Sequence, residues 1–322
     1  MSKPKVYVTR MICDNGIKML KDQGYQVKIN PLDRVLTRKE LLKNVKGIDA
    51  LLCLLTDKID DEVLSAAGKN LKIVANFAVG FDNLDLEAAK NRGIMATNTP
   101  QGSTEAVAEH TMGLLLASAR RIVEADKFTR ANKYKGWKPF LFIGEDIHDK
   151  TLGIIGLGRI GFAVAARALC FGLKIVYHDV VRNPEFEAKF GGKFLETSEL
   201  LKQSDFVTLH VPLMPSTRHL IGKKEFALMK KSAYLINTSR GPVIDEKALV
   251  AALRKKQIAG AAIDVYEFEP KLTPGLTKLN NVILTPHIAS ATIETRMKMS
   301  EIAAQNIIET LSGKTPAHSL HK

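Results

Sequence analysis

The late part of the chain carries three side chains suited to acid–base and anion chemistry, and each follows an apolar run. Arg240 follows "AYLINTS", Glu269 comes shortly after "GAAIDVY", and His287 follows "NVILTP". An imidazole can transfer a proton near neutral pH, a carboxylate can orient it, and a guanidinium can bind a carboxylate and polarise a carbonyl. Each residue alone could equally be a surface or core side chain. If the three runs are neighbouring parallel strands, however, these side chains share the ligand-binding edge of one sheet, which favours a catalytic site.

A glycine-rich turn, Gly156-x-Gly158-x-x-Gly161, lies between the apolar run "TLGII" and a segment with helical periodicity. In a dinucleotide-binding βαβ unit the first glycine permits the turn, the second lets a pyrophosphate approach, and the third lets the helix pack against the strand. The N-terminus of that helix then binds the phosphate. The strand–turn–helix context favours this interpretation over a glycine turn without a ligand.

Asp179 ends the next apolar run, "LKIVYH", eighteen residues after Gly161. A carboxylate at this point can accept hydrogen bonds from ribose hydroxyls and would repel a 2′-phosphate, so the sequence predicts NAD(H) as the preferred cofactor. Arg182 lies three residues further on and could bind that phosphate, which leaves NADP(H) open as a second cofactor.

Strand-like and helix-like segments alternate along the chain, which predicts an α/β fold with parallel sheets. One series of strands occupies the first hundred residues, and a second series starts at Thr151. Between them, residues 103–132 lack proline and predict one long helix with Ser103 or Thr104 as its N-cap. Another long helix is expected to begin with a Ser290 cap and to end at Gly313.

The composition is that of a globular protein large enough for two domains, with 322 residues of which 45% are hydrophobic. Lys and Arg exceed Asp and Glu by 47 − 34 = 13, but these cations are scattered in pairs. This pattern predicts a solvated basic surface and no nucleic-acid partner. Cys13, Cys53 and Cys170 have no CxxC spacing, so we expect buried free thiols, no metal site and a cytoplasmic location. The N-terminus has no signal-peptide pattern, and the longest apolar runs are too short to cross a membrane, so no membrane partner is expected.

Taken together, the motifs resemble those of the D-isomer-specific 2-hydroxyacid dehydrogenase family, and within it most resemble the glyoxylate/hydroxypyruvate reductases. The resemblance is carried by the glycine turn, "NTSRGPVIDEKAL", "DVYEFEP", "TPHIAS", "ANFAVGFDNLDLEAAKNRGI" and "TNTPQGSTEAVAEHTMGLLLA". It implies two Rossmann-like, doubly wound parallel-sheet domains, one flavodoxin-like and one NAD-binding, with a cleft between them. The substrate domain would comprise residues 1–100 and 287–322, and the NAD-binding domain residues 101–286.

The resemblance also implies roles for individual residues. His287 would be the acid/base, Glu269 would support its protonated form, and Arg240 would pair with the carboxylate and carbonyl oxygen of the substrate. The backbone of Val79 and Gly80 would hold the substrate carboxylate. The remaining matches are positions that line the cofactor: Thr104, Gly156, Gly158, Arg159, Ile160, Gly161, Asp179, Val211, Pro212, Thr217, Thr238 and, near the nicotinamide amide, Asp264.

The activity that the resemblance implies is reduction of a small anionic 2-keto acid, glyoxylate or hydroxypyruvate, to a 2-hydroxy acid of D configuration. A homodimer packed through the NAD-binding domain is also implied. Many glyoxylate and hydroxypyruvate reductases carry a Ser- or Arg-rich stretch after the second cofactor strand; this chain has "HDVVRN" there, which favours NADH. Two alternatives stay open. The same fold could act on phosphite or a bulkier 2-keto acid, or the chain could be a non-enzymatic, NAD-sensing module similar to a corepressor.

Overall fold

The computed structural model describes residues 3–321, which fall into two compact units. Unit 1 consists of Met1–Ser103 and Ala291–Lys322, and unit 2 of Thr104–Ser290. The chain therefore enters unit 2 three residues after the boundary expected at residue 100, and it leaves unit 2 four residues after the boundary expected at residue 286.

Unit 1 is built on a five-stranded parallel sheet in the order β2-β1-β3-β4-β5. This is the flavodoxin-like order of a doubly wound sheet. The strands are β1 (Lys5–Val8), β2 (Gln26–Ile29), β3 (Ala50–Leu54), β4 (Ile73–Phe77) and β5 (Met95–Thr97). The helices are α1 (Asp14–Asp22), α2 (Arg38–Asn44), α3 (Asp61–Ala67), α4 (Leu86–Asn91) and the C-terminal α12 (Ile293–Leu311).

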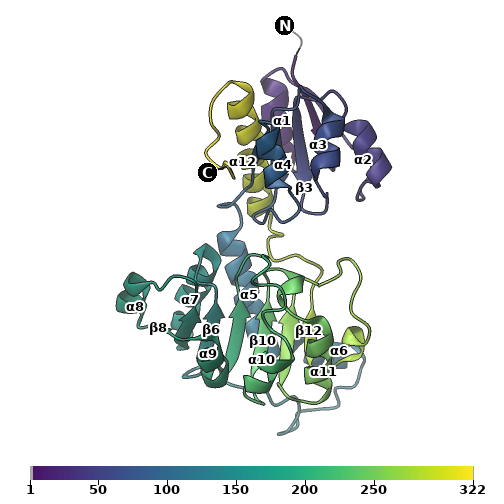
Figure 1. The fold of residues 1–322 in the computed structure, drawn as a ribbon. Coiled ribbons are helices and arrows are strands. Elements are labelled where there is room, and N and C mark those ends of the chain that lie inside the picture. Colours follow the sequence, from purple (N-terminus) through teal and green to yellow (C-terminus); the bar gives the residue numbers. More distant parts are fainter. Residues whose placement is uncertain (1–2, 322) are drawn as a thin grey trace. The chain divides into compact units, whose positions relative to one another are not determined.

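Two apolar cores cover the two faces of this sheet. Helices α1 and α12 pack on one face, and α2, α3 and α4 pack on the other. The first and last parts of the chain thus lie side by side, as Figure 1 shows for the purple α1 and the yellow α12. The central strands β3 and β4 are buried on both faces, which agrees with their mostly apolar sequences, whereas the edge strand β2 is partly exposed.

Unit 2 contains a seven-stranded parallel sheet in the order β12-β11-β10-β9-β6-β7-β8. Counted from β6, this is the dinucleotide-binding order with an added edge strand. The strands are β6 (Thr151–Ile155), β7 (Lys174–His178), β8 (Lys193–Phe194), β9 (Phe206–Leu209), β10 (Tyr234–Asn237), β11 (Gly260–Ile263) and β12 (Val282–Leu284). The two sheets confirm the predicted α/β class.

Helices cover both faces of the unit 2 sheet. The α-helices are α5 (Thr104–Ala119), α6 (Ile122–Arg130), α7 (Arg159–Cys170), α8 (Pro184–Phe190), α9 (Thr197–Gln203), α10 (Lys223–Leu228) and α11 (Glu246–Arg254), with short 3-10 turns at Gly241–Val243 and Leu276–Lys278. Helices α5 and α7 bury one face, and α9, α10 and α11 bury the other. The short β8 and helix α8 lie at one outer edge of the sheet (Figure 1).

The long helix expected over residues 103–132 is wrong, because the chain forms α5 and α6 with a break between them. Arg121 adopts a left-handed conformation, with φ 54°, at the start of α6. The carbonyl of Ala119 at the end of α5 accepts a hydrogen bond from the backbone N–H of Glu145, at 2.8 Å, instead of continuing the helix. A segment distant in sequence therefore ends α5, which helical periodicity alone does not reveal.

Two smaller expectations also differ from the structure. The N-cap of α12 is Thr292, whose hydroxyl accepts from the N–H of Thr295, and not Ser290. Of the three free thiols only Cys53 is buried; Cys13 is half-buried and Cys170 is exposed at the end of α7. An apolar run on one helix still has an outward face, and Cys170 lies on it.

Candidate active site

The glycine turn follows β6, and each of its three glycines meets a different steric demand. Gly156 has a φ of 96°, and a Cβ there would come within 2.7 Å of the carbonyl carbon of His210. A Cβ on Gly161 would overlap the carbonyl oxygen of Gly156. At Gly158 a Cβ would meet nothing within 4 Å, so this position is open to a ligand. The turn therefore has the close contacts at its ends and the free approach at its centre that a pyrophosphate requires.

The open side of the turn leads to the N-terminus of α7. Gly158 is the N-cap residue of this twelve-residue helix and provides no capping side chain. The first backbone N–H groups of such a helix, together with its dipole, bind phosphate oxygens. A cavity of about 530 Å³ lies beside it and is lined by three of the expected cofactor positions, Thr104, Gly158 and Arg159. These residues fit a dinucleotide phosphate.

Asp179 follows β7 and is held against the glycine turn. Its Oδ2 accepts a hydrogen bond from the backbone N–H of Leu157 at 2.6 Å, and its Oδ1 accepts from the N–H of Val180 at 2.7 Å. Each carboxylate oxygen keeps a further lone pair for a ribose hydroxyl. The two bonds thus fix the orientation of the carboxylate that would select between cofactors.

The other expected cofactor positions belong to loops next to the turn. The backbone of Val211 lies 2.9 Å from the Cβ position of Gly156. The Thr217 hydroxyl donates to the carbonyl of Pro212 at 2.6 Å and so ties that loop to itself. Thr238 is buried, and its hydroxyl lies 2.8 Å from that of Thr111 in α5. Two of these threonine hydroxyls therefore already have partners within the protein, which indicates a role in shaping the loops.

His287 follows β12 in a strained backbone conformation, with a φ of 56°. Its N–H donates to the carbonyl of Asp264 at 2.9 Å, and its Nδ1 lies 3.0 Å from Oε2 of Glu269. The other carboxylate oxygen of Glu269 accepts from the N–H of Tyr266 at 2.9 Å. Because Nδ1 is paired with a carboxylate, Nε2 is the ring nitrogen left to exchange a proton with a ligand.

The charge of Glu269 is set by opposing effects. Burial raises its pKa, but the hydrogen bond to His287 and the charges of His287 and Arg240 outweigh burial, and the pKa is lowered. The carboxyl group of Glu269 is therefore ionised at neutral pH and accepts the hydrogen bond from the imidazole beside it. The side chains of His287 and Glu269 are 26% and 32% exposed, so a ligand can reach them.

Arg240 reaches the same edge of the sheet through the loop after β10. The next residue, Gly241, has no room for a Cβ because the backbone of Tyr266 occupies that position. This contact joins the loop after β10 to the loop after β11, which carries Glu269. The carbonyl of Arg240 accepts from the side-chain amide of Asn237 at 2.9 Å, which holds the loop in place. The structure therefore brings Arg240, Glu269 and His287 together at the carboxyl edge of three adjacent strands.

Asp264 has a role that sequence reasoning missed. Its side chain is fully buried and accepts from the hydroxyl of Thr285 at 2.6 Å and from the N–H groups of Ile288 and Ala289 at 2.9 and 2.8 Å. Burial raises its pKa, but hydrogen bonds from His110, Thr285 and the two backbone groups outweigh it, and the pKa is lowered. Asp264 thus holds the turn that carries His287, a role that its position directly after β11 does not reveal in the sequence.

Val79 and Gly80 belong to unit 1, in the loop that follows β4. The carbonyl of Val79 accepts from the side-chain amide of Asn98 at 2.6 Å, and that of Gly80 accepts from Asn76 at 3.0 Å. Both asparagines are buried. The two bonds fix the peptide planes of the loop, and with them the directions of its N–H groups.

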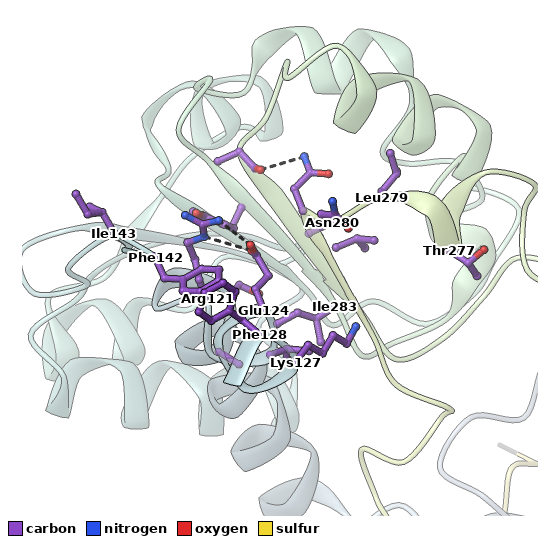
Figure 2. A pocket seen from close by; sticks show the side chains of 18 of the residues that line it. Arg121, Glu124, Lys127, Phe128, Phe142, Ile143, Thr277, Leu279, Asn280 and Ile283 are labelled. Carbon is purple, nitrogen blue, oxygen red and sulfur yellow. Dashed lines mark hydrogen bonds and ion pairs between the residues drawn. The ribbon is translucent and has the colours of Figure 1, made fainter. Parts of the chain in front are cut away.

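A larger cavity, of about 640 Å³, lies at the amino ends of β10, β11 and β12. Figure 2 shows Arg121, Glu124 and Phe128 on one side of it and Leu279 and Asn280 on the other. Because the strands are parallel, this edge is opposite to the one that carries Arg240, Glu269 and His287. Among residues 3–321, no group of His, Cys, Asp and Glu side chains has the arrangement of a metal site. Within the same range, no helix combines the length and the hydropathy needed to cross a membrane.

Comparison with known proteins gives consistent results. Residues 112–289 match the family described as D-isomer specific 2-hydroxyacid dehydrogenase, NAD binding domain. A glyoxylate reductase from Thermococcus litoralis is 49% identical over 99% of this chain and 97% of its own length. A crystal structure of a glyoxylate reductase from Paecilomyes thermophila superposes with a TM-score of 0.89 at 33% identity, covering 100% of this chain and 99% of that one. An NADPH-dependent glyoxylate/hydroxypyruvate reductase from Sinorhizobium meliloti, solved with NADP and malonate, gives a TM-score of 0.86 at 30% identity, covering 99% and 97%.

Proposed function

The chain belongs to the D-isomer-specific 2-hydroxyacid dehydrogenase family of oxidoreductases, and from that premise we propose that it reduces small 2-keto acids, glyoxylate and hydroxypyruvate first among them, to D-2-hydroxy acids with NADH. The observation that carries the proposal is the meeting of Arg240, Glu269 and His287 at the carboxyl edge of a dinucleotide-binding sheet. An acid/base, a carboxylate that supports it and a fixed cation are the groups that carbonyl reduction requires.

In this proposal each residue has a defined task. A bound nicotinamide cofactor supplies the hydride to the carbonyl carbon. His287 donates its Nε2 proton to the carbonyl oxygen, and the Glu269 carboxylate stabilises the protonated ring before that transfer. Arg240 binds the substrate carboxylate and polarises the carbonyl. In the oxidative direction His287 accepts the hydroxyl proton.

NADH is the proposed reductant because the fixed carboxylate of Asp179 favours ribose hydroxyls over a 2′-phosphate. The proposed substrate is small because several relatives that match nearly the whole chain are named glyoxylate reductases. A steady-state panel tests both points, with glyoxylate, hydroxypyruvate, pyruvate and a branched 2-keto acid, each with NADH and NADPH, and with phosphite and NAD. Turnover of phosphite or only of the branched acid would reassign the substrate. No turnover of any compound, with retained NADH binding, would favour the NAD-sensing module.

The site assignment has its own test. We expect His287→Ala and Arg240→Ala each to lower kcat/KM for glyoxylate by about 10² to 10⁴, the range that a general acid supplies. His148→Ala and Arg130→Ala remove the same side-chain types from exposed positions of unit 2, 77% and 79% exposed, and should leave kcat/KM unchanged. Wild-type rates in both site variants would show that the chemistry lies elsewhere.

We propose further that two copies associate through unit 2. The irregular segment after α6 exposes large apolar side chains, with Trp137 81%, Phe140 83% and Ile143 59% exposed. Such a cluster on a single chain marks an interaction surface. Light scattering should then give twice the chain mass of 35.5 kDa. The three free thiols favour a cytoplasmic location, where thiols stay reduced, and cell fractionation tests that location.

A further inference from the structure

The segment after Asp179 contains one cation, Arg182, which could in principle bind a 2′-phosphate. In the structure one paired face of its guanidinium is held by Glu187: Nε lies 2.8 Å from Oε1 and Nη2 lies 2.6 Å from Oε2. We propose that Glu187 is a specificity-determining residue that keeps Arg182 from binding NADP(H), so that the preference for NAD(H) depends on this ion pair as well as on Asp179. The inference rests on the proposed use of NAD(H) in unit 2.

Glu187 is held from a second side by the sheet. The hydroxyl of Tyr177, a fully buried residue of β7, donates to Oε1 of Glu187 at 2.8 Å. That hydroxyl in turn accepts from the backbone N–H of Asn183 at 2.7 Å. Although Arg182 is 64% exposed, the carboxylate is only 17% exposed. The anion is therefore the fixed member of the pair, and the cation is the member that could move.

Helix α8 prevents Glu187 from following Arg182 toward a ligand. Asn183 caps this helix through a hydrogen bond of 2.9 Å from the N–H of Phe186. The Phe186 ring is 1% exposed and packs against the rings of Phe162 and Tyr177. Helix α8 is thus anchored to the sheet edge (Figure 1), and Glu187 stays beside Tyr177 wherever Arg182 points.

The net negative charge around Arg182 also disfavours binding of a 2′-phosphate. Between residues 178 and 187 the chain has one cation, Arg182, and three carboxylates, Asp179, Glu185 and Glu187, which sum to +1 − 3 = −2. A 2′-phosphate would bring further negative charge and would have to compete with Glu187 for the guanidinium. Arginine binds carboxylate and phosphate with paired N–H donors, and Glu187 occupies the Nε–Nη2 pair and neutralises the charge that would attract the phosphate. A neutral amide at residue 187 competes much less well.

The ion pair can be broken without endangering the fold. An ion pair whose cation is largely exposed contributes little to stability, and Glu187→Gln keeps the size of the side chain and one acceptor for Tyr177. We expect Glu187→Gln to raise the ratio of NADH to NADPH dissociation constants by about tenfold, through tighter NADPH binding, since hydrogen bonds to charged groups are the stronger class. Binding of NADH should stay within about twofold of wild type, because Asp179 keeps both of its backbone bonds.

Two further variants make the comparison decisive. Arg182→Ala combined with Glu187→Gln should lose the whole gain, because the freed guanidinium is its cause. Asp126→Asn weakens another arginine–carboxylate pair of unit 2, in which Nε of Arg130 donates to both carboxylate oxygens of Asp126 at 2.8 and 2.9 Å, and it should leave the ratio unchanged. The same comparison is made in an Asp179→Asn background, where NADPH binding is easier to measure. A ratio that moves less than about twofold in Glu187→Gln in both backgrounds, or a gain that survives removal of Arg182, would overturn the inference.

Dissociation constants are measured by isothermal titration of the purified protein with NADH and NADPH, without a substrate. These titrations test the role of Glu187 independently of the proposed reaction. If NADH binds but no 2-keto acid is reduced, the proposed function fails while the role of Glu187 is still decided by the two titrations. If glyoxylate is reduced and the ratio does not respond to Glu187→Gln, the proposed function stands and the inference fails.

Discussion

Replacing Asp264 by asparagine tests whether the turn that carries His287 is held by a buried carboxylate. In the native protein Oδ1 accepts from Thr285 and Ile288, and Oδ2 accepts from Ala289. The asparagine oxygen could keep the first two bonds, but its NH₂ group would then face the N–H of Ala289, donor against donor. The expected defect is therefore confined to the turn next to His287.

The size of the effect follows from the number of bonds affected. A buried N–H left without a partner costs about 1–3 kcal/mol, and two bonds to a charged acceptor become weaker neutral ones, so the total is about 2–4 kcal/mol. The left-handed conformation of His287, with φ 56°, is itself unfavourable by about 1–3 kcal/mol and depends on this support. If about 2 kcal/mol of this loss shifts the turn toward conformations in which the imidazole of His287 is misplaced, the fraction of active molecules falls and kcat decreases about 30-fold.

The assay combines steady-state reduction of glyoxylate at saturating NADH with thermal unfolding. Asp205→Asn is the matched control. Asp205 accepts from the N–H of Thr151 at 2.9 Å and from Lys230 at 2.8 Å, but it precedes β9 at the opposite edge of the same sheet. Both variants should unfold at lower temperature, and only Asp264→Asn should lose kcat. A kcat within about twofold of wild type in Asp264→Asn, with a lowered Tm, would refute the reasoning.

The remaining predictions concern stability and assembly. Burial lowers the pKa of His210 from 6.5 to about 3. The folded chain then binds fewer protons than the unfolded chain below pH 6.5, so this group destabilises the protein by about 2 kcal/mol at pH 5, and stability returns as the pH rises toward 7. His210→Asn should flatten the drop in Tm between pH 7 and pH 5, whereas His148→Asn, at an exposed residue, should not; equal drops would contradict the burial argument. Trp137→Arg should halve the mass measured by light scattering without lowering Tm, and an unchanged mass would remove that segment from the proposed dimer interface.

Much of the fold follows from local patterns that need no tertiary information. The strands of both sheets lie where apolar runs predict them, apart from β8, whose two residues are too short to show a pattern. The glycine turn is also local in origin, because a positive φ at Gly156 and the close packing at Gly161 exclude other residues at those points of the chain. Asp179 follows from the same motif, since the strand after the turn must end beside it.

Other features depend on contacts between distant segments. Residues 103–132 are periodic enough for one helix, but α5 ends at Ala119, where the carbonyl accepts from the N–H of Glu145 and Arg121 adopts a left-handed conformation. The contact that joins the loops of Arg240 and Glu269 exists because Gly241 meets Tyr266, a residue on another strand's loop.

The amino-acid sequence by itself determined the α/β class, the dinucleotide turn and the identity of the three residues that meet at the site, because periodicity, steric exclusion and side-chain chemistry are properties of short segments. Only the tertiary structure decided that Asp264 supports the His287 turn and that Glu187 occupies Arg182. Both facts depend on where buried hydrogen-bond donors and acceptors meet after folding. A carboxylate next to a strand end looks the same in the sequence whether it faces a ligand, a backbone N–H or a guanidinium.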